Sequence, residues 1–407
     1  MITLNELSNL SKSCTCGNRH YEITIEDINI SYNALNEAVT YIKNKEFQKV
    51  AIVADQITFQ VAGEKLASLL VEGKVNSEVV IIQPNELDDV IADEISLIEA
   101  MLGISQDTNV VIAVGTGTIH DIARFASFKM GKPFISVPTA PSVDGFNSMG
   151  APVVIKGFKL TYQMHSPIAI FADLSILQEA PKELIAAGFG DMIGKYTSLA
   201  DWKFSHLIGG ESYCPLSARL TYEALDDCVK YVDQISDADE EGIKILIQAL
   251  IQSGLAMLLV GHSSPASGGE HHLSHYWEME FLKQGRAQVL HGAKVAVSAQ
   301  LILEVYKNKV LTLISNKHRL ENLDAKNKDM LHKVIEKQTE VEAIIHSLPD
   351  PESLSLLVQK VGGAGSPGEL GIHTELVQNS LLEGHTLRNR YTMLKFWNEH
   401  VGTHHYA

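Results

Sequence analysis

The first 180 residues alternate between short β-branched runs and segments whose apolar residues recur at helical spacing. The runs of strand character are residues 49–55, 77–84, 109–115, 133–139 and 168–173. Between them, segments such as 59–70 and 119–130 repeat their apolar residues at helical intervals. This alternation predicts a parallel β-sheet with helices on both faces. Gly157, inside the stretch 152–162, predicts a hairpin that interrupts the pattern.

After residue 180 the pattern becomes almost entirely helical. The segments with helical spacing are residues 182–204, 215–236, 240–259, 292–306 and 328–346. Loops rich in Gly, Ser and Pro separate them, as at 261–269 and 362–371. The sequence therefore predicts an α/β, Rossmann-like domain over residues 1–180 and an all-helical domain over residues 181–407. A cleft between two such domains is where ligands usually bind.

The composition is that of an ordinary globular chain, with 45% apolar and 20% charged residues over 407 positions. A formal net charge of -16 argues against nucleic-acid and anionic membrane partners, since both require a basic face. The N-terminal sequence lacks the apolar stretch of a signal peptide, so we expect a cytoplasmic protein. Residues 243–260 are strongly apolar but contain Lys244, Gln248, Gln252 and Ser253, and their apolar residues recur at helical intervals, which favours a buried helix over a membrane span.

The chain has four cysteines, Cys14, Cys16, Cys214 and Cys228. They are too few for a disulfide scaffold and too scattered along the sequence for a four-thiolate zinc site. Cys14 and Cys16 fit either a small metal or redox site or a pair of reduced bystander thiols near a chain end. We expect the second of these.

Four residues of the second half suggest a metal site. Asp191, His271, His275 and His291 are each framed by small residues and helix-forming sequence. One carboxylate and several imidazoles are a typical ligand set for a divalent ion held between helices. The alternative is that these are hydrogen-bonded core residues, because 17 histidines will fall near one another by chance.

The glycine-rich sequence VGTGTIHDIARF, residues 114–125, follows a predicted strand and opens a predicted helix. Gly115 and Gly117 allow close approach of a ligand, and the free N–H groups at the start of the helix favour a pyrophosphate. Asp121 stands near the position of the third glycine of a strict dinucleotide motif. A tight strand-to-helix turn with no ligand explains the same glycines.

Asp55 ends the predicted strand 49–55. A carboxylate there accepts hydrogen bonds from the ribose hydroxyls of NAD and repels the 2′-phosphate of NADP, which favours NAD. The competing interpretation is that Asp55 caps a helix that starts near Thr58.

The loop VPTAPSVDGFNSMG, residues 137–150, is dense in hydroxyl groups and follows another strand. Thr139 and Ser142 fit a phosphate or ribose, Asp144 a substrate hydroxyl, and Ser148 the nicotinamide end of a cofactor. Turn chemistry alone also accounts for these residue types. It does not account for three such loops at one edge of the predicted sheet.

Seven motifs occur together in a recognisable order. They are GTGTIHD (115–121), PTAPSVDGFNS (138–148), IKGFK (155–159), GFGDMIGK (188–195), SGGEHHLSH (267–275), VLHGAKVA (289–296) and LRNRYTML (387–394). With them the chain resembles, over roughly residues 25–397, the superfamily of glycerol dehydrogenase, iron-type alcohol dehydrogenase and dehydroquinate synthase. Within it the resemblance is closest to the glycerol-1-phosphate dehydrogenases of the bacterial branch.

The resemblance implies metal ligation by Asp191, His271 and His291, with zinc or nickel as the ion. His272 leaves the choice of ligand within its segment open. We assign His271 because it precedes His275 by four residues, which places both on one helical face.

The resemblance also implies a nicotinamide cofactor, NAD with NADP possible. The residues that would hold it are Asp55, Gly115, Thr116, Gly117, Thr118, Ile119, Thr139, Ser142 and Ser148. One departure from the family is visible, since many members have consecutive glycines where this chain has Gly115-Thr116-Gly117-Thr118. The departure leaves the individual pyrophosphate contacts open.

The implied activity is a metal-dependent, NAD(P)H-linked interconversion of dihydroxyacetone phosphate and sn-glycerol 1-phosphate. Asp144, Asp191 and His275 are the expected catalytic residues, with His275 facing the substrate as a proton relay. Lys156 and Lys159 are candidates for the substrate phosphate, although each is equally well explained as a solvated surface lysine.

Arg388 and Arg390 are further phosphate candidates, which we expect to serve helix packing or ion pairing instead. Other functions left open are a glycerol (polyol) dehydrogenase, a dehydroquinate synthase-like lyase and a non-catalytic protein that has kept the fold. A homodimer is the expected assembly for such a metabolic enzyme.

Overall fold

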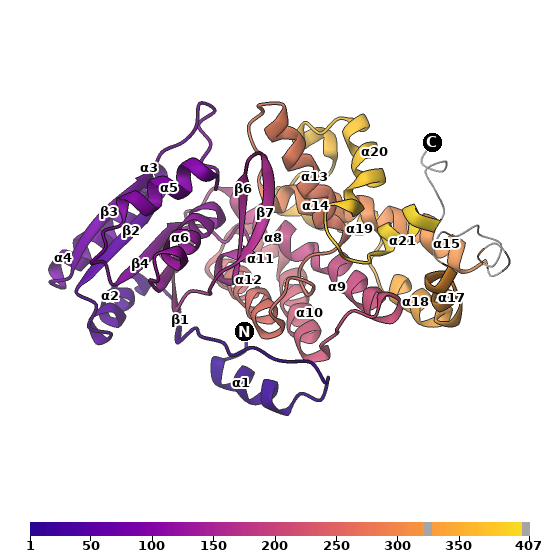
Figure 1. Cartoon of the computed structure of the whole chain (residues 1–407), viewed down its shortest axis with the longest axis horizontal. Helices are drawn as coiled ribbons and strands as arrows, with labels where there is room; N and C mark the ends of the chain where they lie inside the picture. Colours follow the sequence, from indigo (N-terminus) through magenta and orange to yellow (C-terminus); the bar gives the residue numbers. More distant parts are fainter. Residues whose placement is uncertain (317, 319, 321–327, 401–407) are drawn as a thin grey trace.

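Six parallel strands form one sheet in the order β1-β8-β5-β4-β2-β3 (Figure 1). The computed structural model describes residues 1–316, 318, 320 and 328–400. The strands are β1 (Asp27–Ser31), β2 (Lys49–Asp55), β3 (Asn76–Ile82), β4 (Val110–Gly115), β5 (Phe134–Pro138) and β8 (Ala169–Asp173). The chain changes direction across the sheet between β2 and β4, so the loops after these two strands diverge and leave a crevice at their carboxyl ends.

Helices cover both faces of this sheet, as the alternation predicts. On one face, α2 (Ala34–Asn44) and α4 (Glu64–Glu72) pack against residues such as Ile52. On the other face, α5 (Glu94–Gly103) and α6 (Gly117–Lys129) pack against residues such as Val53. Successive residues of one strand thus pack into two separate apolar cores. Because both faces of the sheet are buried, the strand sequences are continuously apolar rather than alternating.

All five predicted strands are confirmed, with ends that differ by one or two residues. Strand β1 was not predicted, because Asp27, Asn29 and Ser31 alternate with apolar residues and the strand lies half-buried at the edge of the sheet. The predicted hairpin is also confirmed as β6 (Gly150–Ile155) and β7 (Phe158–Gln163). Its turn has a positive φ at Gly157, as a two-residue hairpin turn requires.

The chain after β8 is helical. The helices with described bounds are α7 (Leu174–Leu177), α8 (Lys182–Ile193), α9 (Lys195–Phe204), α10 (Pro215–Lys230), α11 (Val232–Asp237), α12 (Glu240–Val260), α13 (Gly269–Lys283), α14 (His291–Glu304), α15 (Leu311–Ile314), α17 (Lys328–Glu336), α18 (Gln338–His346), α19 (Pro351–Lys360), α20 (Thr374–Glu383) and α21 (Met393–His400). The predicted helix over 182–204 is divided at Gly194, where any Cβ would lie 2.5 Å from Val295. The fold class predicted from the sequence is therefore confirmed.

Helix α12 is the apolar segment that raised the question of a membrane span. Within the described residues it is the one helix long and apolar enough to cross a bilayer, and 89% of its most apolar window is buried in the protein. Its side chains belong to the large core that the helical half shares with β8. The prediction of a buried core helix is confirmed.

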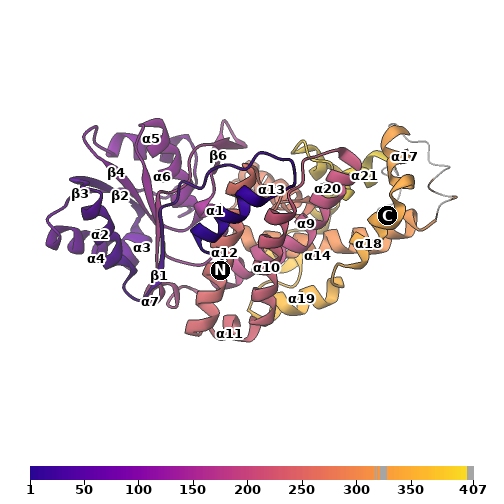
Figure 2. The same ribbon diagram turned by 90° about the horizontal axis from the view of Figure 1, so that it is seen from below.

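The first helix, α1 (Leu4–Ser13), lies against the helical half of the molecule rather than against the sheet (Figure 2). Leu7 is fully buried there, and the Ile2 backbone N–H donates to Gln252 Oε1 of α12 at 2.9 Å. The chain then passes along α12, where the Tyr21 N–H donates to the Leu259 carbonyl at 2.9 Å, before it enters β1. The N-terminal segment thus spans both halves of the molecule.

Candidate active site

A cavity of about 390 Å³ lies between the carboxyl ends of the sheet strands and the helical half. Its walls include residues 89–92, the start of α6, the loop 142–150 with the β6-β7 hairpin, the loop after α12, the facing sides of α13 and α14, and Arg388. Both halves of the chain therefore contribute side chains to one partly open cavity, as expected for a ligand site where two parts of a fold meet.

Close packing of α8 on α14 brings the metal-ligand candidates to one wall of this cavity. A Cβ at Gly292 would lie 1.8 Å from the Ala187 carbonyl oxygen, and one at Gly190 would lie 2.5 Å from the Gly292 carbonyl oxygen. Only hydrogen atoms fit at these two positions, so the small residues of the GFGD and HGAK motifs set the helix spacing. Asp191 follows Gly190 on α8, and His291 begins α14.

Asp191, His271 and His291 come together, with one ligand atom from each lying within 4.8 Å of the others; His271 and His291 line the cavity, whereas Asp191 is fully buried. We call these three residues the metal cluster. The His271 Nε2 atom is 3.9 Å from Asp191 Oδ1, and the His271 and His291 ring centroids are 5.1 Å apart. One carboxylate oxygen and two imidazole nitrogens suit a divalent ion, and three protein ligands leave a coordination position open for a substrate. The residues present fit a catalytic metal.

Asp191 is held in place from two further directions. Its Oδ2 accepts the Asp144 backbone N–H at 2.8 Å, and its Oδ1 accepts from Lys195 Nζ at 2.8 Å. Although burial opposes ionisation, Lys195 and His271 lower the pKa of Asp191, so the carboxylate stays charged as a metal ligand must be. Burial and the neighbouring Asp191 charge raise the pKa of Asp144. Asp144 lines the cavity while its Oδ2 is held by Lys195 and by the Ser253 hydroxyl.

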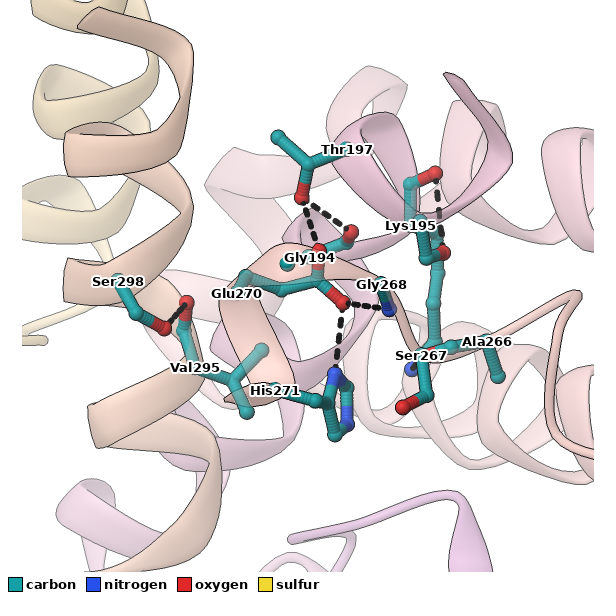
Figure 3. Close-up of polar contacts among 12 residues, drawn as sticks. Gly194, Lys195, Thr197, Ala266, Ser267, Gly268, Glu270, His271, Val295 and Ser298 are labelled. Atoms are coloured by element: carbon teal, nitrogen blue, oxygen red, sulfur yellow. Dashed lines mark hydrogen bonds and ion pairs between the residues drawn. The ribbon is translucent and has the colours of Figure 1, made fainter. Parts of the chain in front are cut away.

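His271 is oriented by Glu270, a buried carboxylate that the sequence did not single out (Figure 3). Glu270 Oε1 accepts from His271 Nδ1 at 2.7 Å and from the Gly268 backbone N–H at 2.6 Å. Its Oε2 accepts from the Thr197 hydroxyl at 2.6 Å. Because Nδ1 carries the proton toward Glu270, Nε2 presents its lone pair to the metal cluster. His272, the competing residue, is buried away from the cluster with both ring nitrogens lacking a described hydrogen-bond partner.

His275 lies on α13 one turn beyond His271, with their ring centroids 6.1 Å apart. Its Nε2 accepts from Arg388 Nη2 at 2.9 Å, and its Nδ1 lies 3.5 Å from Glu278 Oε2. Burial and the charge of Arg388 hold the pKa of His275 well below its ordinary value. The imidazole is therefore neutral near pH 7.

Beside His275, the cavity is lined by Lys159, Lys294 and Arg388 together with Glu278, which we call the cation cluster. Lys159 Nζ lies 2.7 Å from both Glu278 carboxylate oxygens, and Lys294 Nζ lies 3.3 Å from Oε2. Although burial opposes ionisation, the charges of Lys159 and Lys294 hold the pKa of Glu278 well below its ordinary value. One carboxylate among three cations leaves the cation cluster net positive, which suits a dianionic phosphate.

The structure distinguishes among the lysines and arginines that the sequence offered as candidates for binding the substrate phosphate. Lys159 lines the cavity, whereas Lys156 occupies the exposed hairpin turn, where its N–H donates to Glu94. Arg388 was expected to serve packing, but its guanidinium lines the cavity and donates to Ser267 Oγ at 3.0 Å. Arg390 is not among the residues that line the cavity, and its Nη2 lies 3.4 Å from Ser263 Oγ. Lys294 was missed, although it follows His291 by one helical turn.

The start of α6 forms the opposite wall of the cavity. Thr116, Gly117 and Thr118 line it, and the Thr116 side chain makes no capping hydrogen bond to the helix. The first N–H groups of α6 therefore meet the cavity without a side-chain cap, as a pyrophosphate site requires. Gly117 also permits contact with the neighbouring loop, because a Cβ there would lie 2.8 Å from Val143.

The remaining cofactor candidates divide into two groups. Ser142 and Ser148 line the cavity. Gly115, Ile119, Thr139 and Asp55 lie outside its lining. Ile119 is buried in the apolar core against Gly115, so any cofactor contact would come from its backbone. Asp55 caps the short helix α3 (Gln56–Thr58), as the competing interpretation predicts, because its Oδ1 accepts the Thr58 N–H at 2.7 Å.

Arg124, fully buried on α6, fixes the loop between β5 and β6, and the sequence did not single it out. It forms an ion pair with Asp121 at 2.8 Å and donates to the carbonyl oxygens of Gly145, Phe146 and Gly150. Each of these bonds is charge-assisted and sheltered from water. The loop carrying Ser142, Asp144 and Ser148 is thereby tied to the helix that would bind the pyrophosphate.

Comparison with known proteins identifies the family. The family described as iron-containing alcohol dehydrogenase matches residues 29–181. The chain is 50% identical over 399 residues to the glycerol-1-phosphate dehydrogenase (NAD(P)+) of Geobacillus stearothermophilus, covering 98% of each chain. It is 42% identical over 400 residues to the protein of that name from Halalkalibacterium halodurans, covering 98% of this chain and 99% of the relative.

The solved structures support the same fold at much lower identity. Maleylacetate reductase from Rhizobium sp. strain MTP-10005 superposes with a TM-score of 0.65 at 13% identity, covering 92% of this chain and 93% of that one. At that identity the match concerns the fold alone. Sequence identity of 42 to 50% over nearly the full length is decisive, and the chain belongs to the glycerol-1-phosphate dehydrogenases.

Proposed function

We propose that this chain interconverts dihydroxyacetone phosphate and sn-glycerol 1-phosphate with a nicotinamide dinucleotide and one divalent metal ion. The observation that carries the proposal is a single cavity lined by the uncapped start of α6, by His271 and His291 of the metal cluster, and by the cation cluster. These three features suit a pyrophosphate, an electrophilic ion and a substrate phosphate, in that order.

When bound, the ion would polarise the C2 carbonyl of the substrate and stabilise the negative charge that develops on its oxygen during hydride transfer. Asp191, His271 and His291 would hold it. The start of α6 would hold the pyrophosphate, and Ser142 would assist as a hydrogen-bond partner. Ser148 would contact the nicotinamide end.

The cation cluster would recognise the substrate phosphate and free His275 in the same step. Arg388 Nη2 now donates to His275 Nε2, and a phosphate would compete for that donor. Release of Nε2 would let the neutral imidazole accept or return a proton at the substrate oxygen. Polyols without a phosphate would leave Arg388 on His275, which is why the cation cluster favours a phosphorylated substrate over glycerol.

Zinc or nickel is the proposed ion, because imidazole and carboxylate ligands suit both and the metal cluster has no thiolate. NAD is the proposed cofactor, with NADP also used. Asp55 at the end of β2 supports NAD, because a carboxylate at that edge of the sheet repels a 2′-phosphate.

We further propose that residues 1–180 serve mainly the dinucleotide and residues 181–407 the metal and substrate. The protein is proposed to act in the cytoplasm as a homodimer, without nucleic-acid or membrane partners. The net charge of -16 supports the last point, and solution scattering or sedimentation would test the dimer.

The test is oxidation of NADH followed spectrophotometrically with dihydroxyacetone phosphate or with dihydroxyacetone. We expect turnover with the phosphorylated substrate, loss of turnover after chelation, and recovery with zinc or nickel. Equal turnover of dihydroxyacetone would support a polyol dehydrogenase instead. A lyase of the dehydroquinate synthase type would turn over without net consumption of NADH, and that outcome would also reject the proposal.

A further inference from the structure

A second cluster of metal-ligating side chains lies away from the active site, where the N-terminal segment meets the start of α10. It contains Cys14, Cys16 and His20 of the N-terminal segment together with Cys214, the residue that precedes α10. One ligand atom of each residue lies within 4.8 Å of every other. Cys214 is far from the other three residues in the sequence, so it is the fold that brings the four together.

The distances in this cluster match those around a tetrahedral zinc ion. The Sγ atoms of Cys14 and Cys214 are 4.0 Å apart, and His20 Nε2 is 3.4 Å from Cys16 Sγ and 3.3 Å from Cys214 Sγ. Zn–S bonds of about 2.3 Å and Zn–N bonds of about 2.0 Å in a tetrahedron place ligand atoms roughly 3.5–3.8 Å apart. A shift of a few tenths of an ångström brings these three pairs to tetrahedral distances, and the remaining pairs lie within 4.8 Å.

The surroundings of His20 and Cys214 favour metal ligation. His20 Nδ1 faces the Ser11 carbonyl oxygen at 3.1 Å, so Nδ1 carries the proton and Nε2 directs its lone pair toward the sulfur atoms. The Ser217 backbone N–H in the first turn of α10 points at Cys214 Sγ at 3.5 Å. The start of α10 thus places a backbone donor beside this sulfur atom.

We propose that Cys14, Cys16, His20 and Cys214 bind a structural zinc ion. Three thiolates and one imidazole form a closed, four-ligand set, in contrast to the three-ligand metal cluster of the active site. The ion would fasten the N-terminal segment to the helical half, in addition to the apolar packing of Leu7 and hydrogen bonds such as that from Asn18 Nδ2 to the Tyr213 carbonyl at 2.7 Å. Two reduced bystander thiols, the interpretation favoured from the sequence, do not account for His20 and Cys214 beside them.

The first experiment counts zinc by mass spectrometry in chains that lack the active-site ion. The variant His291→Ala is expected to retain one zinc per chain after dialysis, and His291→Ala with Cys16→Ser is expected to retain none. The control is His291→Ala with Cys228→Ser, because Cys228 is a buried cysteine outside the cluster and its loss should leave one zinc. Equal zinc in all three variants, or none in His291→Ala, would overturn the proposal.

The second experiment keeps the cluster intact and does not depend on how well a cysteine variant folds. Cobalt is exchanged into His291→Ala, and we expect the visible bands of tetrahedral cobalt with intense thiolate-to-cobalt charge transfer. A chain purified with reductant that takes up no cobalt would contradict the site. So would mass-spectrometric detection of a Cys14–Cys214 disulfide as the dominant form under the same conditions.

Discussion

At the scale of single residues, the candidate active site depends on groups that hold the proposed metal ligands in one geometry. Asp191 is held by Lys195 and by the Asp144 backbone, and His271 by Glu270. Such partners fix the tautomer and direction of a ligand before an ion arrives. The sequence indicated the proposed ligands because histidine and aspartate are recognisable ligand types. It did not indicate Glu270 or Lys195, since a charged residue in a helix is usually solvated.

Replacing Glu270 with Gln should weaken metal binding by about 10-fold to 100-fold, because the amide is a poorer acceptor for the His271 Nδ1–H. The measurement is competition for zinc against a chromogenic chelator. Glu383→Gln, at an exposed carboxylate that binds the Tyr276 hydroxyl, is the matched control and should retain wild-type affinity. Unchanged affinity in Glu270→Gln would show that His271 needs no such partner.

Lys159→Gln should raise the KM for dihydroxyacetone phosphate about 10-fold to 100-fold, because it removes one charge-assisted contact worth about 1.5–3 kcal/mol. Dihydroxyacetone, which has no phosphate, should be affected far less. Lys156→Gln, in the same hairpin but exposed at its turn, is the control and should leave both constants unchanged. A similar rise in KM for both substrates would remove Lys159 from phosphate recognition.

At the scale of helices and strands, the sequence predicted most of the fold because apolar periodicity reports burial directly. It missed β1, a half-buried edge strand in which polar and apolar residues alternate, and it joined α8 to α9 because helical spacing continues across Gly194. The crossing of α8 and α14 could not be predicted, although its glycines were visible. Glycine is required at these positions only because a second helix packs closely there, and the sequence does not show which helix that is.

Gly292→Ala should lower the free energy of unfolding by about 1–3 kcal/mol, because the new Cβ would lie 1.8 Å from the Ala187 carbonyl oxygen. This reverses the usual sign, since Gly to Ala inside a helix normally stabilises it. Metal affinity should fall as well, because His291 begins the displaced helix. Urea unfolding tests the first effect, with Gly368→Ala as control, since a Cβ at Gly368 meets no atom within 4 Å.

At the scale of the whole molecule, the cavity exists because two halves of the chain meet at it. The positive groups show this most clearly: Lys159 comes from a hairpin, Lys294 from α14 and Arg388 from the C-terminal region. The sequence offered Lys159 and Arg388 as phosphate candidates, but no spacing relates them to Lys294, so their convergence could not be predicted. The N-terminal segment likewise packs on helices far along the chain, a contact that local pattern does not encode.

Addition of metal at 100 times its Kd should stabilise the wild-type chain by about 2.7 kcal/mol relative to the chain without active-site metal, because the ion binds the folded state alone. His291→Ala should lose this gain while keeping the fold. The measurement is urea unfolding of both chains with and without added metal. Equal stabilisation of the two chains would place the responsible ion elsewhere.

The central claim is that Asp191, His271 and His291 share one metal ion in the same cavity that holds the nicotinamide. The most direct measurement is an anomalous-difference map, from crystals grown with NADH and collected at the absorption edge of the metal that restores activity. We predict a peak within bonding distance of one atom from each of the three residues, beside a cofactor whose pyrophosphate lies at the start of α6. A fully loaded crystal with no peak there, or with the cofactor bound outside this cavity, would contradict the claim.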